Sequence, residues 1–332
     1  MKAANLTKEQ LAGQRLMVGF DGTTLNLDLK FLIDRLKVGG IILFSRNLET
    51  PNQIMRLCGE IQDFARRCEQ PPLFIAVDQE GGQVARLKAP FTQFPGNPHI
   101  KSEDEAIRFA EVTAAELTRV GINMNMAPVL DIAPEDINSI MAGRAFGSDP
   151  SWVTKLGIKV IDRLQGNKII SVAKHFPGIG RTVMDSHLDL PELDVDTTTI
   201  ERMDLIPFKA GIQQGVSGVM LSHIFYRNLD SQWPASLSHK IAKVLLRDRL
   251  GFGGIALTDD LDMGAIVKHF DIQTAIHQIL AAEIDLALIC HKGPNIEIAY
   301  AEILNGIMES DMMKAKGLES AVRIMKLKNR YL

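Results

Sequence analysis

The sequence predicts a single-domain (β/α)8 barrel of the TIM type, and three observations support this prediction. Eight short apolar runs recur along the chain, stretches with helical periodicity separate them, and polar residues follow several of the runs. That alternation is typical of parallel βα units. A barrel of about 250 residues with insertions accommodates 332 residues as one domain. We therefore expect residues 1–332 to form one barrel with extra N- and C-terminal helices.

Each expected strand is a short apolar run. The runs span residues 16–20, 40–44, 73–77, 122–126, 169–173, 218–221, 254–257 and 285–289. Eight strands fit a closed barrel better than an open doubly wound sheet, which usually has fewer strands and a glycine-rich nucleotide turn. The chain has neither a G-x-G-x-x-G nor a Walker motif, and we expect no cofactor.

The best-marked helix spans residues 103–120. Ser102 and Glu105 predict a capping box at its start, and Gly121 predicts its end. Further helices are expected at residues 52–67, 152–165, 238–250 and 295–308.

Composition and charge exclude several classes of protein. A formal net charge of −3 gives no basic excess for nucleic acid. The three cysteines have no metal-ligand spacing, which favours free thiols in a reducing compartment. Charged and amide side chains interrupt the first 20 residues, so no export signal is expected, and no apolar run is long enough to span a bilayer. We expect a cytoplasmic protein.

Active sites of such barrels lie at the carboxyl ends of the strands. A single polar strand end has an ordinary explanation as a solvated end, but six of them here predict a shared site. They are Asp78-Gln79-Glu80, Asp131, Lys174-His175, Ser222-His223, Asp259-Asp260 and His291-Lys292.

The loop after the fifth expected strand carries Gly178 and Gly180, which can act as hinges over a substrate. Asp185 and His187 lie two residues apart, so the carboxylate can orient the imidazole for proton transfer. An exposed turn with incidental Asp and His is the alternative.

Asp259 stands where the seventh expected strand meets the barrel mouth, and a carboxylate there can attack an anomeric carbon. Asp260 would point elsewhere, as a helix cap or as an acceptor behind its neighbour. Spacing alone does not choose between the two.

Taken together, these residues give the chain a resemblance to the family 3 glycoside hydrolases, in particular to one-domain bacterial β-N-acetylglucosaminidases of cell-wall recycling. The match covers nearly the whole chain, and its most specific part is the pairing of Lys174-His175-Phe176-Pro177-Gly178 with Asp185-Ser186-His187. The other matching strings are Leu11-x-x-Gln14-x-Leu16-Met17-Val18-Gly19, Val77-Asp78-Gln79-Glu80-Gly81-Gly82-Gln83-Val84-x-Arg86, Ala127-Pro128-Val129-Leu130-Asp131, Gly143-Arg144-Ala145-Phe146-Gly147 and Thr258-Asp259-Asp260-Leu261-x-Met263-x-Ala265-Ile266.

By this resemblance, Asp259 is the nucleophile and His187, oriented by Asp185, is the general acid/base. The resemblance implies a retaining hydrolase that removes terminal β-linked N-acetylglucosamine from small glycosides such as cell-wall fragments, without a metal. Residues that correspond to the family's sugar-binding side chains are Asp78, Arg86, Arg144, Lys174 and His175.

One position departs from the family pattern, because Ile179 stands where a histidine is usual, which bears on loop closure and leaving-group recognition. Two-domain members take their acid/base from a second domain, and we expect this chain to rely on His187.

Other functions stay open on the sequence alone. They are a family 3 enzyme with another sugar specificity, a phosphorylase variant, an inactive sugar-binding barrel, and a metal-dependent barrel hydrolase. Zinc ligands in the last case would come from Lys174, His175, His223, Asp259 and His291. The aglycone and the oligomeric state are not fixed by the sequence.

Overall fold

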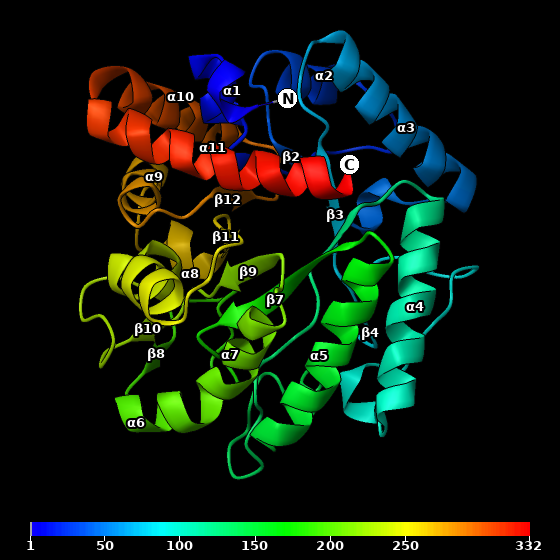
Figure 1. Ribbon diagram of the computed structural model, residues 1–332, viewed down its shortest axis with the longest axis vertical. Coiled ribbons are helices and arrows are strands. Elements are labelled where there is room, and N and C mark those ends of the chain that lie inside the picture. The colour runs from blue at the N-terminus through cyan, green and yellow to red at the C-terminus, as the bar shows by residue number, and fades with distance from the viewer. Residues whose placement is uncertain (1) are drawn as a thin grey trace.

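The computed structural model describes residues 2–332, and a closed barrel of eight parallel strands forms its centre (Figure 1). Around the barrel the strands follow the order β1-β12-β11-β9-β7-β6-β3-β2. They are β1 (Leu16–Val18), β2 (Gly40–Leu43), β3 (Phe74–Val77), β6 (Met124–Asn125), β7 (Ile170–Phe176), β9 (Gly218–Leu221), β11 (Ile255–Asp260) and β12 (Leu286–Ile289). The predicted (β/α)8 barrel is confirmed. Met1, which the prediction included, lies outside the described residues.

Two strands run further toward the barrel mouth than their apolar residues indicate. β7 continues to Phe176, which pairs with Leu221, and β11 continues to Asp260, which pairs with Leu288. Each extension follows a register irregularity that lets a polar stretch stay in the sheet. Lys174, His175 and Asp259 therefore lie on strands and not in the loops after them.

Two small sheets lie outside the barrel, and the sequence did not predict them. β4 (Gln79–Gly81) pairs with β5 (Val84–Ala85) in antiparallel fashion, and β8 (Glu192–Leu193) pairs with β10 (Phe225–Tyr226) in parallel. The first of these sheets follows β3 directly, so it holds the residues after that strand beside the barrel mouth.

Helices surround the barrel (Figure 1). They are α1 (Lys8–Gly13), α2 (Leu27–Asp34), α3 (Pro51–Arg67), α4 (Glu103–Arg119), α5 (Pro150–Gly166), α6 (Thr197–Thr199), α7 (Leu205–Gln213), α8 (Gly264–Val267), α9 (Ile272–Ala281), α10 (Pro294–Glu309) and α11 (Asp311–Tyr331). Shorter 3-10 segments are Ala3–Asn5, Ser45–Asn47, Asn97–His99 and Ala235–Leu237, and the π-helical segments are Ile200–Asp204 and Lys240–Arg249.

The expected helices are present, with two differences in detail. The helix expected at residues 238–250 has π-type hydrogen bonding over Lys240–Arg249. At the start of α4, the Ser102 side chain accepts from the Glu105 N–H as predicted, but the Glu105 carboxylate accepts from the N–H of Lys101. The predicted capping box is therefore wrong in its second half.

The C-terminal helix α11 closes the barrel at the end opposite the polar strand ends. Its Ile324 and Leu327 belong to the same buried cluster as the interior residues Met17 and Phe74. The Lys328 ammonium is buried there and donates to the backbone oxygen of Gly39 at 2.8 Å. In Figure 1, α11 lies beside α10 and α1, with the C-terminus near the strand labelled β3. The polar strand ends lie at the other end of the barrel, where α11 does not cover them.

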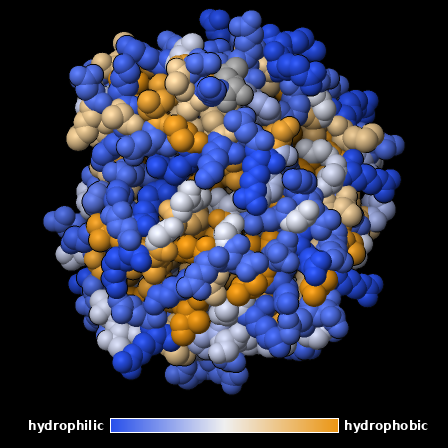
Figure 2. All heavy atoms as spheres, viewed as in Figure 1, coloured by the Kyte–Doolittle hydropathy of each residue, from blue (hydrophilic) through white to orange (hydrophobic). Residues whose placement is uncertain are grey.

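The surface seen in Figure 2 is mostly hydrophilic, with hydrophobic side chains in patches among the polar ones. In the part of the chain that the structure describes, every helix is too short or too polar to cross a membrane.

Candidate active site

A cavity of about 750 Å³, counted to its open mouth, lies at the carboxyl ends of the barrel strands. All eight residues that the sequence singles out for a site contribute to its wall. They are Asp78, Arg86, Arg144, Lys174, His175, Asp185, His187 and Asp259. Ile179 contributes an apolar side chain to the same wall. Because these residues come from segments far apart in the sequence, the barrel is what brings them together.

A buried network of charges forms one wall of this cavity. The Lys174 ammonium lies 2.7 Å from an Asp78 carboxylate oxygen and 2.6 Å from a Glu80 oxygen. Arg144 binds both oxygens of Glu80, through Nε at 3.0 Å and Nη2 at 2.7 Å. Two cations and two anions thus neutralise one another, which is the condition for burying charge at tolerable cost.

The network fixes the ionisation of its members. Burial alone would raise the pKa of Asp78, but Lys174 and then Arg86 hold it at about 2. Glu80 likewise has a lowered pKa, because Lys174 and Arg144 outweigh its burial. Burial opposes the charge of Lys174, yet the two carboxylates raise its pKa. All three side chains are charged at neutral pH, ready to form charge-assisted hydrogen bonds with hydroxyl groups.

His175 is held by a carboxylate at its back. The Asp131 Oδ2 atom lies 2.7 Å from His175 Nδ1, and Asp131 also accepts from the backbone N–H groups of His175 and Ile179. The other ring nitrogen of His175 lies 3.5 Å from the Arg144 guanidinium. Asp131 therefore sets the direction of the imidazole toward the cavity.

Glu80 and Asp131 are the functional positions that the sequence reasoning named as strand ends but did not assign to the site. Glu80 had a usable signal, since it lies two residues after Asp78 and residues two apart in extended chain share a face. Asp131 had none, because its role depends on the tertiary approach of β7.

Asp259 lies on β11 and faces the cavity. Burial would raise the pKa of its carboxyl, but His175 and His223, the backbone N–H of Asp260 and Lys174 together lower it. One carboxylate oxygen accepts from that N–H at 2.9 Å. The side chain is therefore an ionised carboxylate at the floor of a cavity, which is the state that a nucleophile requires.

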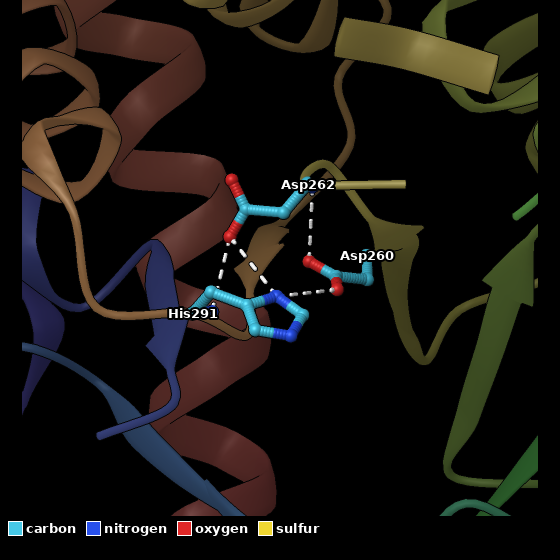
Figure 3. Close-up of side chains that lie close together, drawn as sticks. All are labelled: Asp260, Asp262 and His291. Atoms are coloured by element: carbon cyan, nitrogen blue, oxygen red, sulfur yellow. Dashed lines mark hydrogen bonds and ion pairs between the residues drawn. The ribbon is translucent and has the colours of Figure 1, made fainter. Parts of the chain in front are cut away.

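Asp260 belongs to a different arrangement from its neighbour, shown in Figure 3. Its Oδ1 accepts from the N–H groups of Asp262 and Cys290, so it is an acceptor and not a helix cap. Burial, with Asp262 and Asp259 nearby, raises its pKa to about 6. The His291 ring points between the carboxylates of Asp260 and Asp262, with its Nδ1 3.6 Å from an oxygen of each.

Among residues 2–332, this trio is the one group of three His, Cys, Asp or Glu side chains spaced to hold a metal ion. Of the zinc ligands considered from the sequence, only His291 belongs to it. His175 is engaged by Asp131, and His223 contacts the Ser236 hydroxyl at 2.6 Å and the backbone oxygen of Asp260 at 2.8 Å. The zinc site expected for a metal-dependent hydrolase is therefore not assembled.

Three of the six polar strand ends contribute no side chain to the cavity wall, so the expectation that all six converge there is wrong. Asp131 is buried and contacts His175, and His223 is buried beside Asp260 at the end of β11, where burial lowers its pKa. His291 lies beside Asp260 and Asp262, and Lys292 pairs with Asp28 in the wall of a separate pocket. The sequence predicted where the strands end. It did not predict which side chains face the cavity, because successive side chains of a strand point to opposite faces of the sheet.

Asp185 and His187 form the predicted dyad at the cavity mouth. Asp185 Oδ1 lies 2.7 Å from His187 Nδ1 and accepts from the His187 N–H at 2.9 Å. Although burial opposes it, hydrogen bonding to His187 lowers the pKa of Asp185. The His187 side chain is 68% exposed. With Nδ1 engaged, its Nε2 is the ring nitrogen left for a ligand.

The glycines before this dyad have a packing role. A Cβ at Gly180 would lie 1.7 Å from the Ile132 oxygen, and Gly178 has a φ of +127° with its carbonyl bound by Tyr226. Both glycines thus permit close packing where the loop leaves β7.

With a (β/α)8 barrel, a partly buried ionised carboxylate and an imidazole–carboxylate dyad in one cavity, the fold and site are those of a glycoside hydrolase. Residues 7–327 match the glycosyl hydrolase family 3 N terminal domain. The chain therefore belongs to glycosyl hydrolase family 3.

Named relatives agree with this assignment. The chain is 34% identical to "Beta-hexosaminidase A" of Pseudoalteromonas piscicida, over 98% of this chain and 61% of that protein. A solved family 3 β-N-acetylglucosaminidase from Paenibacillus sp. is similar with a TM-score of 0.94 and 35% identity, over 98% of this chain and 63% of that one. The chain thus spans about three fifths of the length of these two proteins.

A third relative has nearly the length of this chain. The structure of NagZ from Neisseria gonorrhoeae in complex with N-trifluoroacetyl-D-glucosamine matches with a TM-score of 0.75 and 26% identity, over 93% of this chain and 98% of that one.

Proposed function

We propose that this glycoside hydrolase is a retaining β-N-acetylhexosaminidase, which removes terminal β-linked N-acetylglucosamine from small glycosides. The observation that carries the proposal is that Asp259, ionised and partly buried, and His187, exposed with its Nε2 facing no partner among the described residues, contribute to one cavity. A retaining mechanism needs a nucleophile on one side of the scissile bond and a proton donor on the other.

In the first step Asp259 attacks the anomeric carbon, a bond forms between that carbon and the carboxylate, and the bond to the leaving oxygen breaks. His187 transfers a proton from Nε2 to the departing oxygen. In the second step His187 takes a proton from water, the water oxygen attacks the anomeric carbon, and the sugar leaves Asp259. Asp185 keeps the imidazole oriented in both steps.

The sugar would be held by the charged wall of the cavity. Lys174, Arg144 and Asp78 offer donors and an acceptor to hydroxyl and acetamido groups, with Arg86 and His175 beside them. The names of the relatives, including one structure with an N-acylated glucosamine, support N-acetylglucosamine as the sugar. Ile179 gives the wall an apolar surface where the family usually has a histidine.

As natural substrates we propose cell-wall fragments in the cytoplasm, within peptidoglycan recycling. Three free thiols, Cys58, Cys68 and Cys290, support a reducing compartment.

The test compares 4-nitrophenyl β-N-acetylglucosaminide with the β-glucoside and β-xyloside, each in phosphate and in phosphate-free buffer. We expect the N-acetylated substrate to be preferred, with equal rates in both buffers and free sugar as product. Preference for glucose or xylose would refute the specificity, and a sugar phosphate as product would identify a phosphorylase.

A further inference from the structure

The loop that carries the dyad is bound to the short helix that follows the proposed nucleophile. Residues 185–189 are called the dyad loop here. Three consecutive backbone oxygens of this loop accept hydrogen bonds from α8 and from Lys268, the residue that follows it. The Ser186 oxygen accepts from the Ala265 N–H at 3.0 Å, and the His187 oxygen accepts from the Gly264 N–H at 3.2 Å. The third oxygen, of Leu188, accepts from the Lys268 ammonium at 2.6 Å.

A side-chain contact extends the same interface. His269 Nε2 lies 2.6 Å from the Asp189 carboxylate, directly after the three backbone contacts. By contrast, the side chains of Asp185, His187 and Leu188 are exposed, and only Ser186 in this loop is buried. The loop is therefore held mainly by its backbone and by Asp189, so its position depends on the segment that receives them.

Gly264 is the position at which this interface allows no side chain. A Cβ there would lie 2.6 Å from the His187 oxygen and 2.8 Å from the Leu188 oxygen, closer than non-bonded atoms approach. Any other residue must therefore increase the separation between α8 and the dyad loop. Misplacing a catalytic group by about 1 Å can cost about a hundredfold in rate.

We propose that Gly264, Ala265, Lys268 and His269, called the α8 dock here, position His187 for proton transfer, with Gly264 as the determining residue. The dock begins five residues after Asp259. One continuous segment therefore carries the proposed nucleophile and also positions the proposed acid/base. This inference rests on the proposed role of His187. None of the four residues contributes to the cavity wall, so they act as positioning residues.

The test is Gly264→Ala, with Gly59→Ala as the matched control, because a Cβ at Gly59 meets nothing within 4 Å. Rates are measured on an alkyl glycoside, whose leaving group needs a proton, and on a dinitrophenyl glycoside, whose leaving group does not. We expect Gly264→Ala to lower kcat/KM for the alkyl substrate at least about tenfold and to leave that for the dinitrophenyl substrate within about twofold. Gly59→Ala should match the wild type on both.

A second pair of variants tests the side-chain contact. His269→Ala should produce the same pattern to a smaller extent, and His269→Gln, which can still donate to Asp189, should recover most of the loss. A rate loss that is equal on both substrates would overturn the positioning role.

Hydrogen exchange separates failure of the dock from failure of the proposed acid/base. The amides of residues 264 and 265 are bonded to the dyad loop, so Gly264→Ala should speed exchange there and in the loop, whereas Gly59→Ala should not. Unchanged exchange would overturn the dock whatever the kinetics. Faster exchange, together with a His187→Ala variant that shows no dependence on leaving group, would instead refute the acid/base role of His187.

Discussion

Two parts of the candidate site differ in how they are built. The charged wall, which we propose to face the sugar, consists of side chains on or beside barrel strands, where Lys174 is 3% exposed and is bound by two carboxylates. The dyad lies on a loop, and His187 is 68% exposed. The comparison indicates that the proposed sugar-binding groups are fixed by the barrel strands, whereas the proposed acid/base lies on a loop whose backbone is bound by α8.

The largest effect should come from the barrel part, at the nucleophile. Asp259→Ala removes the atom that bonds to the sugar, so we expect kcat to fall at least about 10⁴-fold. Asp260→Asn is the matched control, because it neutralises the adjacent carboxyl and keeps the oxygen that accepts from Cys290. It should retain activity to within about tenfold. A fluorosugar inactivator that labels a residue other than Asp259 would overturn this assignment.

The charged wall should show a combined loss of activity and stability. Lys174→Ala leaves Asp78 and Glu80 buried without their shared cation, which should cost on the order of 3 kcal/mol of unfolding free energy. The kcat/KM should fall at least about tenfold, and Arg144→Ala and Asp78→Ala should each reach the same threshold. Lys159→Ala, which breaks an exposed pair with Glu103, serves as the control. If all three wall variants turn over normally, the proposed sugar site is wrong.

The orienting residue of the loop part should show a smaller, substrate-dependent effect than the acid/base that it orients. Asp185→Ala removes the carboxylate that orients His187 but leaves the imidazole, so its loss on poor leaving groups should be several-fold smaller than that of His187→Ala. Steady-state rates across a series of aryl leaving groups measure this. An Asp185→Ala loss larger than that of His187→Ala would contradict an orienting role.

The smallest effect concerns stability and pH. The folded protein holds the pKa of Asp260 at about 6, above the usual 3.8, so its proton is bound more tightly in the folded state. Stability is then lost as pH rises from about 4 through 6. Asp260→Asn removes this cost and should be more stable than the wild type at pH 8, by at most about 3 kcal/mol, with a small difference at pH 4. Urea unfolding at both values measures it, and a variant less stable at pH 8 would contradict the account.

The same contrast explains what could be predicted from the sequence. The barrel part could be predicted, because apolar runs indicate strands and polar residues after them indicate the barrel mouth. All eight predicted site residues contribute to one cavity. Within it, His223 was misplaced because a strand end does not say which face a side chain takes. The bridge from Glu80 to Lys174 and Arg144 was also missed, since it depends on the short sheet of β4 and β5.

The attachment of the dyad loop could not be predicted. Its backbone oxygens meet a four-residue helix across about 80 residues of sequence, and neither hydrophobic period nor spacing records such contacts. Gly264 looked like an ordinary position between Met263 and Ala265. The structure shows why glycine is required there, because the backbone oxygens of His187 and Leu188 leave no room for a Cβ atom.

One measurement tests the central claim most directly, that an exposed histidine on a loop supplies the proton for a nucleophile in the barrel. His187→Ala is mixed with a dinitrophenyl β-N-acetylglucosaminide, and dinitrophenolate is followed from the first turnover. The first step needs no acid, whereas the second still needs a base. We predict a burst followed by a slow steady state, and a loss of about 10² to 10⁴ on poor leaving groups. Equal losses on good and poor leaving groups, without a burst, would contradict the account.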